Sequence, residues 1–223
     1  MRACFQSALP AIVLLGASCS PSQTATTRPA AEKPKGVLEF RVLATKDDPD
    51  AYKFSDYREA LTQRGDLSLA DGPAYRWFAI KDPADFFKSK NLKDEFDGIR
   101  KSRPEIAERR VDDYYILAHT AGDHVMTNVP GAPAWSVKTA RVIRSTRGYT
   151  GIGVDLDDAG KSQLEKLAQS HQGRPLGIFL DDHFIMHAAV MDVITKGITI
   201  HGSFSPSEAE ETVKLLRKTS TPQ

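Results

Sequence analysis

The sequence predicts an α+β protein in which a mainly antiparallel sheet carries helices on one face. Three observations predict this class. Short segments rich in β-branched and aromatic residues recur along the chain. Amphipathic helical stretches with their own start and stop signals lie between and after them. In the C-terminal third, the order strand, helix, strand, strand, strand, helix is typical of helices packed on an antiparallel sheet.

Residues 1–18 of the 223-residue chain are predicted to be an export signal. Arg2 supplies a positive charge, and the apolar run 8–17 leads to small residues before Cys19. This pattern is typical of a secretory signal, and the run is too short to cross a bilayer comfortably. The cysteine resembles that of the bacterial lipoprotein box, although Gly16 stands where leucine is usual. The sequence therefore predicts lipidation at Cys19, and leaves simple cleavage and an uncleaved anchor open.

Residues 19–35 are predicted to form a flexible tether between the signal and the folded chain. They are rich in Pro, Ser, Thr and Ala and nearly free of large apolar side chains, so they cannot bury enough surface to fold. The chain has two cysteines, and Cys4 lies within the signal. After cleavage only Cys19 would remain, which excludes an internal disulfide, a thiolate nucleophile and a thiolate metal site.

Charge and hydropathy exclude further classes of protein. The chain has 30 Lys and Arg against 29 Asp and Glu, so its net charge of +1 gives no reason to expect a nucleic-acid partner. Beyond the signal, no stretch approaches the roughly 18 consecutive apolar residues of a membrane-spanning helix. The composition is that of an ordinary soluble fold.

An N-terminal α+β portion is predicted over residues 36–110. Its predicted elements are a strand over 37–44, a helix over 55–64 that ends at Gly65, and a strand over 74–81. The highly charged stretch 88–110 is expected to be a solvated helix or an excursion from the sheet.

A second domain is predicted over residues 111–219, with a ferredoxin-like C-terminal lobe. Asp157 is placed to cap a helix over 158–171. Ser205 and Glu208 form a capping box for a last helix over 206–218, which is expected to bury Ala209, Val213 and Leu216. The predicted strands cover 112–119, 148–156, 174–180, 184–193 and 197–204.

Three segments of this second domain resemble one known family. They are "GRPLGIFLDDHFIMHAAV", "IHGSFSP" and "EAEETVKLLR". In this order they resemble the large periplasmic domain of SecD, the accessory subunit of the bacterial protein-export channel. "LEFRVLA" and "DDYYILAHTAGDHVMT" upstream also look like SecD segments. The resemblance runs from about residue 36 to 218 and is strongest in the C-terminal third.

The resemblance implies a function in protein contacts rather than in catalysis. The chain is expected to be the SecD head domain alone, without the family's transmembrane helices, held outside the cytoplasm on the inner or outer membrane by its N-terminal lipid. The implied partners are Sec translocon subunits or exported polypeptide, which could add as a strand to an open sheet edge. One alternative is a SecD-derived structural or assembly module of the cell envelope with no role in export. A hydrolase or metal enzyme is a further alternative.

The most conspicuous polar motif holds Asp181, Asp182, His183 and His187. Histidines four residues apart share a metal ion on a helix, but this segment is predicted to be a strand. In a strand, four residues span roughly 13 Å, too far for two imidazoles to reach an ion whose Zn–N bonds are about 2 Å. The two aspartates instead suit a two-residue hairpin turn with positive φ.

No catalytic, cofactor-binding or metal-binding residue is therefore expected. A mixed metal site that joins His201 to a histidine of the motif is the alternative left open. The remaining histidines show no spacing pattern and are expected to be solvated or hydrogen-bonded surface residues: His119, His124 and His171.

Overall fold

Two sheets organise the part of the chain that the computed structural model describes, which comprises residues 36–70, 74–127, 134–144, 150–189, 198–201 and 204–218. All of these residues belong to one compact unit, Pro34–Gln223. The larger sheet has the strand order β3-β4-β2-β9-β8-β1-β5, and the smaller has the order β10-β7-β6. The pair β2–β9 is parallel, whereas the other strand pairs of both sheets are antiparallel.

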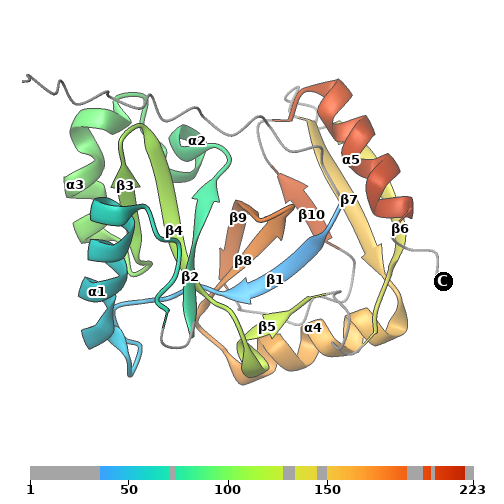
Figure 1. Cartoon of the computed structure of the whole chain (residues 1–223). Coiled ribbons are helices and arrows are strands. Elements are labelled where there is room, and N and C mark those ends of the chain that lie inside the picture. The colour runs from blue at the N-terminus through green and yellow to red at the C-terminus, as the bar shows by residue number, and fades with distance from the viewer. Residues whose placement is uncertain are drawn as a thin grey trace, which may run out of the picture. The chain divides into compact units, whose positions relative to one another are not determined.

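The strands, in chain order, are β1 (Leu38–Val42), β2 (Tyr75–Ile80), β3 (Ala107–Arg110), β4 (Asp113–His119), β5 (Val125–Met126), β6 (Val137–Arg144), β7 (Thr150–Leu156), β8 (Pro175–Leu180), β9 (His183–Ala189) and β10 (Ile198–His201). The helices are α1 (Phe54–Glu59, continued by the wider turn Ala60–Arg64), α2 (Pro83–Phe87), α3 (Leu92–Ser102), α4 (Asp158–Ser170) and α5 (Pro206–Lys218). Figure 1 shows α1, α2 and α3 around the β3-β4-β2 end of the large sheet, with α4 and α5 beside the smaller sheet.

Helices pack on both faces of the β2–β4 pair. Trp77 and Leu117 lie in a buried cluster with side chains of α1, whereas Phe78 and Ile116 lie in another with side chains of α2 and α3. Alternate residues of a strand point to opposite faces, so adjacent positions enter different clusters. Both faces of this end of the sheet are thus filled by apolar side chains.

The third and largest cluster joins the smaller sheet to its two helices. On β7, the alternate residues Ile152, Val154 and Leu156 pack with Leu164 of α4 and Leu216 of α5. Both helices therefore cover the same face of the smaller sheet, whereas the β2–β4 pair has helices on both faces. This arrangement confirms the predicted α+β class with a mainly antiparallel sheet.

The local start and stop signals act as the sequence predicts. Gly65 ends the first helical segment with a φ of 81°. A side-chain oxygen of Asp157 accepts the Gly160 backbone N–H at 2.7 Å and caps α4. In the capping box of α5, Ser205 Oγ accepts the Glu208 N–H at 3.2 Å while Glu208 accepts the Ser205 N–H at 2.9 Å. The three side chains expected inside α5 are buried: Ala209, Val213 and Leu216.

The charged stretch 88–110 differs in part from its prediction. It contains α3, as a solvated helix, but also β3, which pairs with β4. The sequence of β3 is AERR, which lacks the β-branched and aromatic residues that mark a strand, so its pairing is imposed by β4. Strands from before and after residue 110 lie together in the large sheet. The predicted division into domains at residues 110 and 111 remains a prediction.

Several predictions fall outside the described residues: the signal, the tether, lipidation at Cys19, and the strand ends at 148–149, 190–193, 197 and 202–203. In the described part of the chain, no helix is long and apolar enough to cross a membrane.

Candidate functional site

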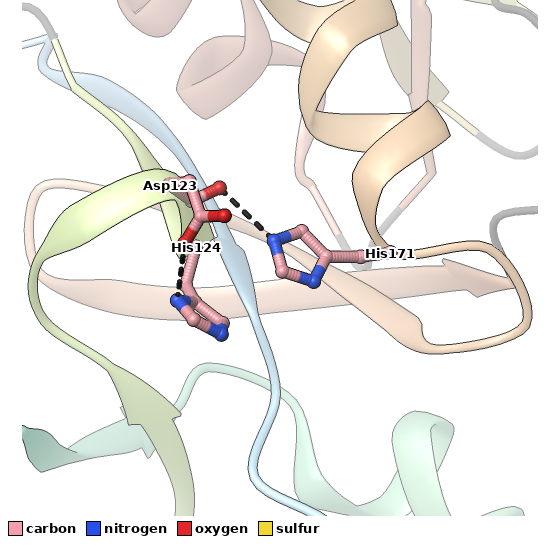
Figure 2. Close-up of side chains that lie close together, drawn as sticks. All are labelled: Asp123, His124 and His171. Atoms are coloured by element: carbon pink, nitrogen blue, oxygen red, sulfur yellow. Dashed lines mark hydrogen bonds and ion pairs between the residues drawn. The ribbon is translucent and has the colours of Figure 1, made fainter.

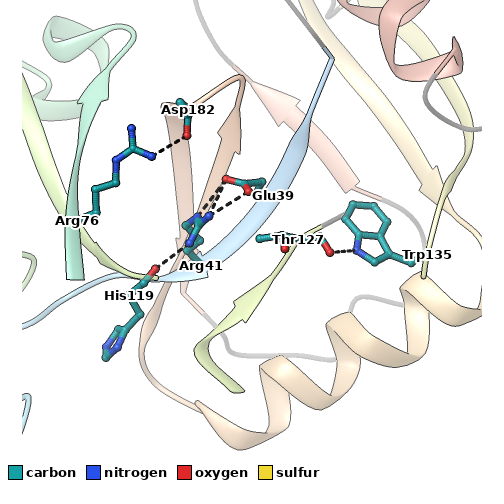
Figure 3. A network of polar contacts seen from close by, with 7 residues as sticks. All are labelled: Glu39, Arg41, Arg76, His119, Thr127, Trp135 and Asp182. Carbon is teal, nitrogen blue, oxygen red and sulfur yellow. Dashed lines mark hydrogen bonds and ion pairs between the residues drawn. The ribbon is translucent and has the colours of Figure 1, made fainter. Parts of the chain in front are cut away.

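The Asp181–Asp182 pair forms the predicted hairpin turn between β8 and β9. Both residues have positive φ, 51° and 63°, as a two-residue turn of this kind requires. The Asp181 carboxylate accepts the Val37 backbone N–H at 2.8 Å, and the Asp181 N–H donates to the Val37 carbonyl at 2.9 Å. Asp182 pairs with Arg76 of β2 at 3.1 Å (Figure 3). These carboxylates therefore fasten the turn to neighbouring strands.

The two histidines of the motif face different partners. The exposed His183 ring bonds the carbonyl of Asp181 at 2.9 Å. The largely buried His187 ring lies 3.3 Å from a Glu105 carboxylate oxygen and edge-on to Phe86. Burial lowers the pKa of His187; the Arg103 charge lowers it further, and Glu105 opposes both. The motif is a turn, as predicted, and the side chain of His201 lies outside the described residues.

Asp48 is the centre of a buried polar node that connects three parts of the fold. Its fully buried carboxylate accepts the Thr45 backbone N–H at 2.7 Å and pairs with Arg174, at the start of β8, at 2.6 Å. His119, at the end of β4, lies 3.6 Å from the same carboxylate. Burial alone would raise the pKa of Asp48, but His119, the Thr45 N–H and Arg174 together hold it below its ordinary value. Burial and the Asp48 charge also raise the pKa of Tyr75 to about 12.

Three histidines from distant parts of the sequence lie side by side next to this node. The rings of His119 and His124 stack at 4.0 Å, and the His124 and His171 rings lie 4.4 Å apart. His119 and His171 are buried, so the prediction of ordinary surface histidines is wrong for both. It failed because these residues come from β4, the turn Gly122–His124 and the end of α4, which only the folded chain brings together.

Asp123 completes this cluster on its solvent side. Its carboxylate lies 2.9 Å from His124 Nδ1, and its backbone carbonyl lies 3.1 Å from His171 Nε2 (Figure 2). Burial and the two neighbouring imidazoles lower the pKa of His124. The cluster thus combines a carboxylate and imidazoles in a partly buried position, which sequence spacing alone could not reveal.

Further polar contacts lie along β1 and beside the segment that follows β5 (Figure 3). Arg41 donates to both carboxylate oxygens of Glu39, two positions away on β1, at 3.0–3.1 Å. It also donates to the His119 carbonyl at 3.1 Å, so this nearly buried pair has its polar atoms satisfied. Farther along, Trp135 Nε1 donates to the Thr127 carbonyl at 3.0 Å and closes the connection from β5 to β6.

The longest edge strand in the described part of the chain is β6, which pairs there with β7 alone. A register shift between Val137 and Thr139 marks a bulge in this pairing. Arg217 of α5 donates two hydrogen bonds, at 2.7 and 2.9 Å, to the Ala140 carbonyl of β6. A shallow groove between β6 and α5 is lined by Arg141, Val142, Glu210, Val213, Lys214 and Arg217.

The edge strands of the large sheet are less suited to pairing with another chain. The strand β5 has two residues, too few for an extended ladder. The strand β3 has four, and its Glu108 is buried between Arg58 and Arg100. A short edge covered by charged side chains is a common protection against strand addition. The strand β10, at the other edge of the smaller sheet, has only four described residues, so β6 is the best candidate among the described edges for contact with another chain.

The part of the chain that contains β6 matches a known protein family. Residues 123–222 match the SecDF P1 head subdomain. This match confirms the predicted resemblance to the SecD periplasmic head for the C-terminal part of the chain, called below the P1-head-like region. The region contains β5 to β10, α4 and α5, and covers less than half of the chain.

Two solved structures of SecDF are also similar to the chain. One is of a membrane component SecDF that enhances protein export (17% identity, TM-score 0.43, covering 85% of this chain and 65% of that one). The other is SecDF in a super-membrane-facing form (17% identity, TM-score 0.45, covering 85% of this chain and 20% of that one). The chain spans less than two thirds of either, and at these TM-scores neither likeness adds to the family match. No curated protein matches the chain.

Proposed function

We propose that the chain is a non-enzymatic extracytoplasmic protein that serves protein export by holding an extended segment of exported polypeptide along the side of β6 with which no described strand pairs. The observation that carries this proposal is the eight-residue edge strand within the P1-head-like region. An edge strand presents backbone N–H and C=O groups that another extended chain can pair with, whatever its side chains. Such pairing suits a protein that handles many different exported sequences.

The length of β6 is sufficient for this role. Six paired residues of a guest strand would cover about 20 Å, since an antiparallel strand rises about 3.4 Å per residue. The side chains of Lys138, Thr139, Arg141 and Arg144 are exposed along the strand, so a guest would meet a polar rim. Arg217 already donates its hydrogen bonds to one carbonyl of the strand, that of Ala140. This contact and the bulge at the start of β6 are devices that keep an edge from aggregating while it is empty.

The groove beside the edge supplies a second surface for the guest. Val142 and Val213 give it an apolar floor, and the cations Arg141, Lys214 and Arg217 outnumber the carboxylate Glu210. A guest side chain that leaves the ladder toward α5 would contact this floor. We expect apolar segments to bind well because of this apolar floor. We expect acidic segments to bind better than basic ones, because the lining carries a net positive charge.

Site-specific photo-cross-linking in native membranes tests the proposal. A photoreactive amino acid replaces the exposed Lys138 on β6, and the same amino acid replaces the exposed Lys161 on α4 as a matched control. We expect exported polypeptides or export-channel subunits to cross-link from position 138 and not from 161, with the products identified by mass spectrometry. Equal products from both positions would contradict the edge as the site. Envelope proteins unrelated to export at position 138 would favour an assembly module instead.

Lipidation at Cys19 is part of the proposal, because an anchor would hold the domain next to the membrane where exported chains emerge. One acyl chain binds a membrane only marginally, whereas several on one residue hold it firmly. Metabolic labelling with a fatty acid should mark the protein, and Cys19→Ser should abolish the label. Continued labelling of that variant would contradict the anchor.

A further inference from the structure

We propose that Asp123, His124 and His171 form a binding site for a divalent transition-metal ion of the zinc type. One donor atom from each of these residues, a carboxylate oxygen and two imidazole nitrogens, lies within 4.8 Å of the other two. Carboxylate and imidazole are preferred ligands of Zn²⁺, and three protein ligands with an open fourth position are a common zinc arrangement. The site is separate from the β6 edge and independent of the proposed function.

The distances are close to those of a metal centre. A tetrahedral Zn²⁺ with bonds of about 2.0–2.1 Å holds its donor atoms roughly 3.3 Å apart. The Asp123 carboxylate and His124 Nδ1 already lie 2.9 Å apart. The His171 ring reaches toward them from the end of α4, as Figure 2 shows. Side-chain rotations that move it by about an ångström would complete the site.

A backbone contact orients one of the imidazoles for this role. His171 Nε2 lies 3.1 Å from the Asp123 carbonyl, which can only accept a hydrogen bond. Before an ion binds, the proton of a neutral His171 ring therefore resides on Nε2, the ring nitrogen that faces Asp123. A metal ion would take the place of this proton, and the ring would keep its other proton on Nδ1.

The surroundings allow an ion to enter and stay. The Asp123 side chain is 72% exposed, so the cluster opens to solvent on that side, whereas His171 is buried on the other. The nearby cation Arg174 is held by the Asp48 carboxylate at 2.6 Å, which offsets its charge. His119 stacks on His124 at 4.0 Å and supports that ring from the protein side.

A bound ion would connect the turn before β5 to the end of α4. Asp123 and His124 belong to this turn, and His171 is the residue at which α4 ends. These segments are 47 residues apart in sequence, so the ion would close a long loop and stabilise the folded state.

Zinc binding to the full chain, prepared without a histidine tag and treated with a chelator, tests this site. Cys4→Ser and Cys19→Ser in all samples remove competing thiolates. We expect one Zn²⁺ per chain by calorimetry and a tetrahedral absorption spectrum with Co²⁺. Asp123→Asn and His171→Gln should each weaken Zn²⁺ binding at least tenfold, the loss that removing even an outer-shell partner causes. His183→Gln, at an exposed histidine outside the cluster, should bind as the parent does.

The exposed position of Asp123 keeps this test decisive, because Asp123→Asn leaves the buried contacts of the fold intact. Circular dichroism confirms the fold of each variant. Absence of saturable one-to-one binding by the parent would overturn the proposal. Unchanged affinity of Asp123→Asn would do the same, and so would an equal loss in His183→Gln.

Discussion

Replacing Asp48 by alanine should destabilise the folded protein strongly, because the Asp48 carboxylate is the centre of the buried polar node. The carboxylate is fully buried and satisfies both the Thr45 N–H and Arg174. Its loss leaves the Thr45 N–H buried without its acceptor, which costs about 1–3 kcal/mol. Breaking a buried ion pair costs about 3–5 kcal/mol in total, because the remaining charge stays uncompensated.

The structure favours the lower end of that range. The Arg174 side chain is 25% exposed, so water can reach its guanidinium once Asp48 is gone. Arg174 also donates to the Leu43 carbonyl at 3.2 Å, a contact that the substitution leaves in place. We therefore expect Asp48→Ala to lower the free energy of unfolding by about 3 kcal/mol, out of the roughly 5–15 kcal/mol typical of a domain.

Urea unfolding followed by the fluorescence of Trp77 and Trp135 measures this loss. Asp47→Ala is the matched control, since Asp47 is the exposed neighbour in the same loop and should change stability by less than about 0.5 kcal/mol. A loss in Asp48→Ala no larger than in this control would refute the reasoning.

The difference in stability between the parent and Asp48→Ala should also depend on pH. The folded-state pKa of Asp48 lies below its ordinary value of 3.8. Its ionised form therefore contributes its full stability above pH 3.8, and the contribution is lost as the pH falls through the lower folded-state pKa. The gap in stability between the parent and Asp48→Ala should narrow in that acidic range. A gap that stayed constant down to the acid unfolding transition would contradict this part.

Three further predictions test other parts of the fold. Gly177→Ala should cost about 1–3 kcal/mol in urea unfolding, because its Cβ would lie 2.6 Å from Phe179 Cε2 and 2.7 Å from Leu43 Cδ2; unchanged stability would contradict this close packing. Ser205→Ala should cost about 1 kcal/mol by the same measurement, because it removes the cap of α5; a change below a few tenths would mean that the cap is not formed. Burial lowers the folded-state pKa of His187 below 6.5, so the parent should lose stability as the pH falls below 6.5, and His187→Gln should lose less. An equal fall of the melting temperature with falling pH in the parent and in His187→Gln would contradict this last prediction.

Local features of this chain could be predicted from the sequence because a few adjacent residues determine them. The Asp181–Asp182 turn follows from the tolerance of aspartate for positive φ, and the caps at Asp157 and Ser205 follow from side chains that reach backbone groups three positions away. The strand β9 was likewise predicted next to its turn, and four residues of a strand span roughly 13 Å, which is the argument against a metal ion shared by His183 and His187.

The polar clusters could not be predicted in this way. Asp48 meets Arg174 across 126 positions of sequence, and Asp123 meets His171 across 48. No spacing rule reaches so far, and only the pairing of β1 with β8 brings the Asp48 and Arg174 segments together. The same reason explains the missed strand β3, whose partner β4 rather than its own residues makes it extended.

Hydrogen–deuterium exchange of the backbone amides, with and without an unfolded exported polypeptide, tests the central claim most directly. We expect the guest to slow exchange in β6, residues 137–144, and to leave exchange in β3, residues 107–110, unchanged. Strand addition produces this result because it hydrogen-bonds edge amides that otherwise face solvent. Unchanged exchange in β6 at a guest concentration that saturates binding would contradict the claim.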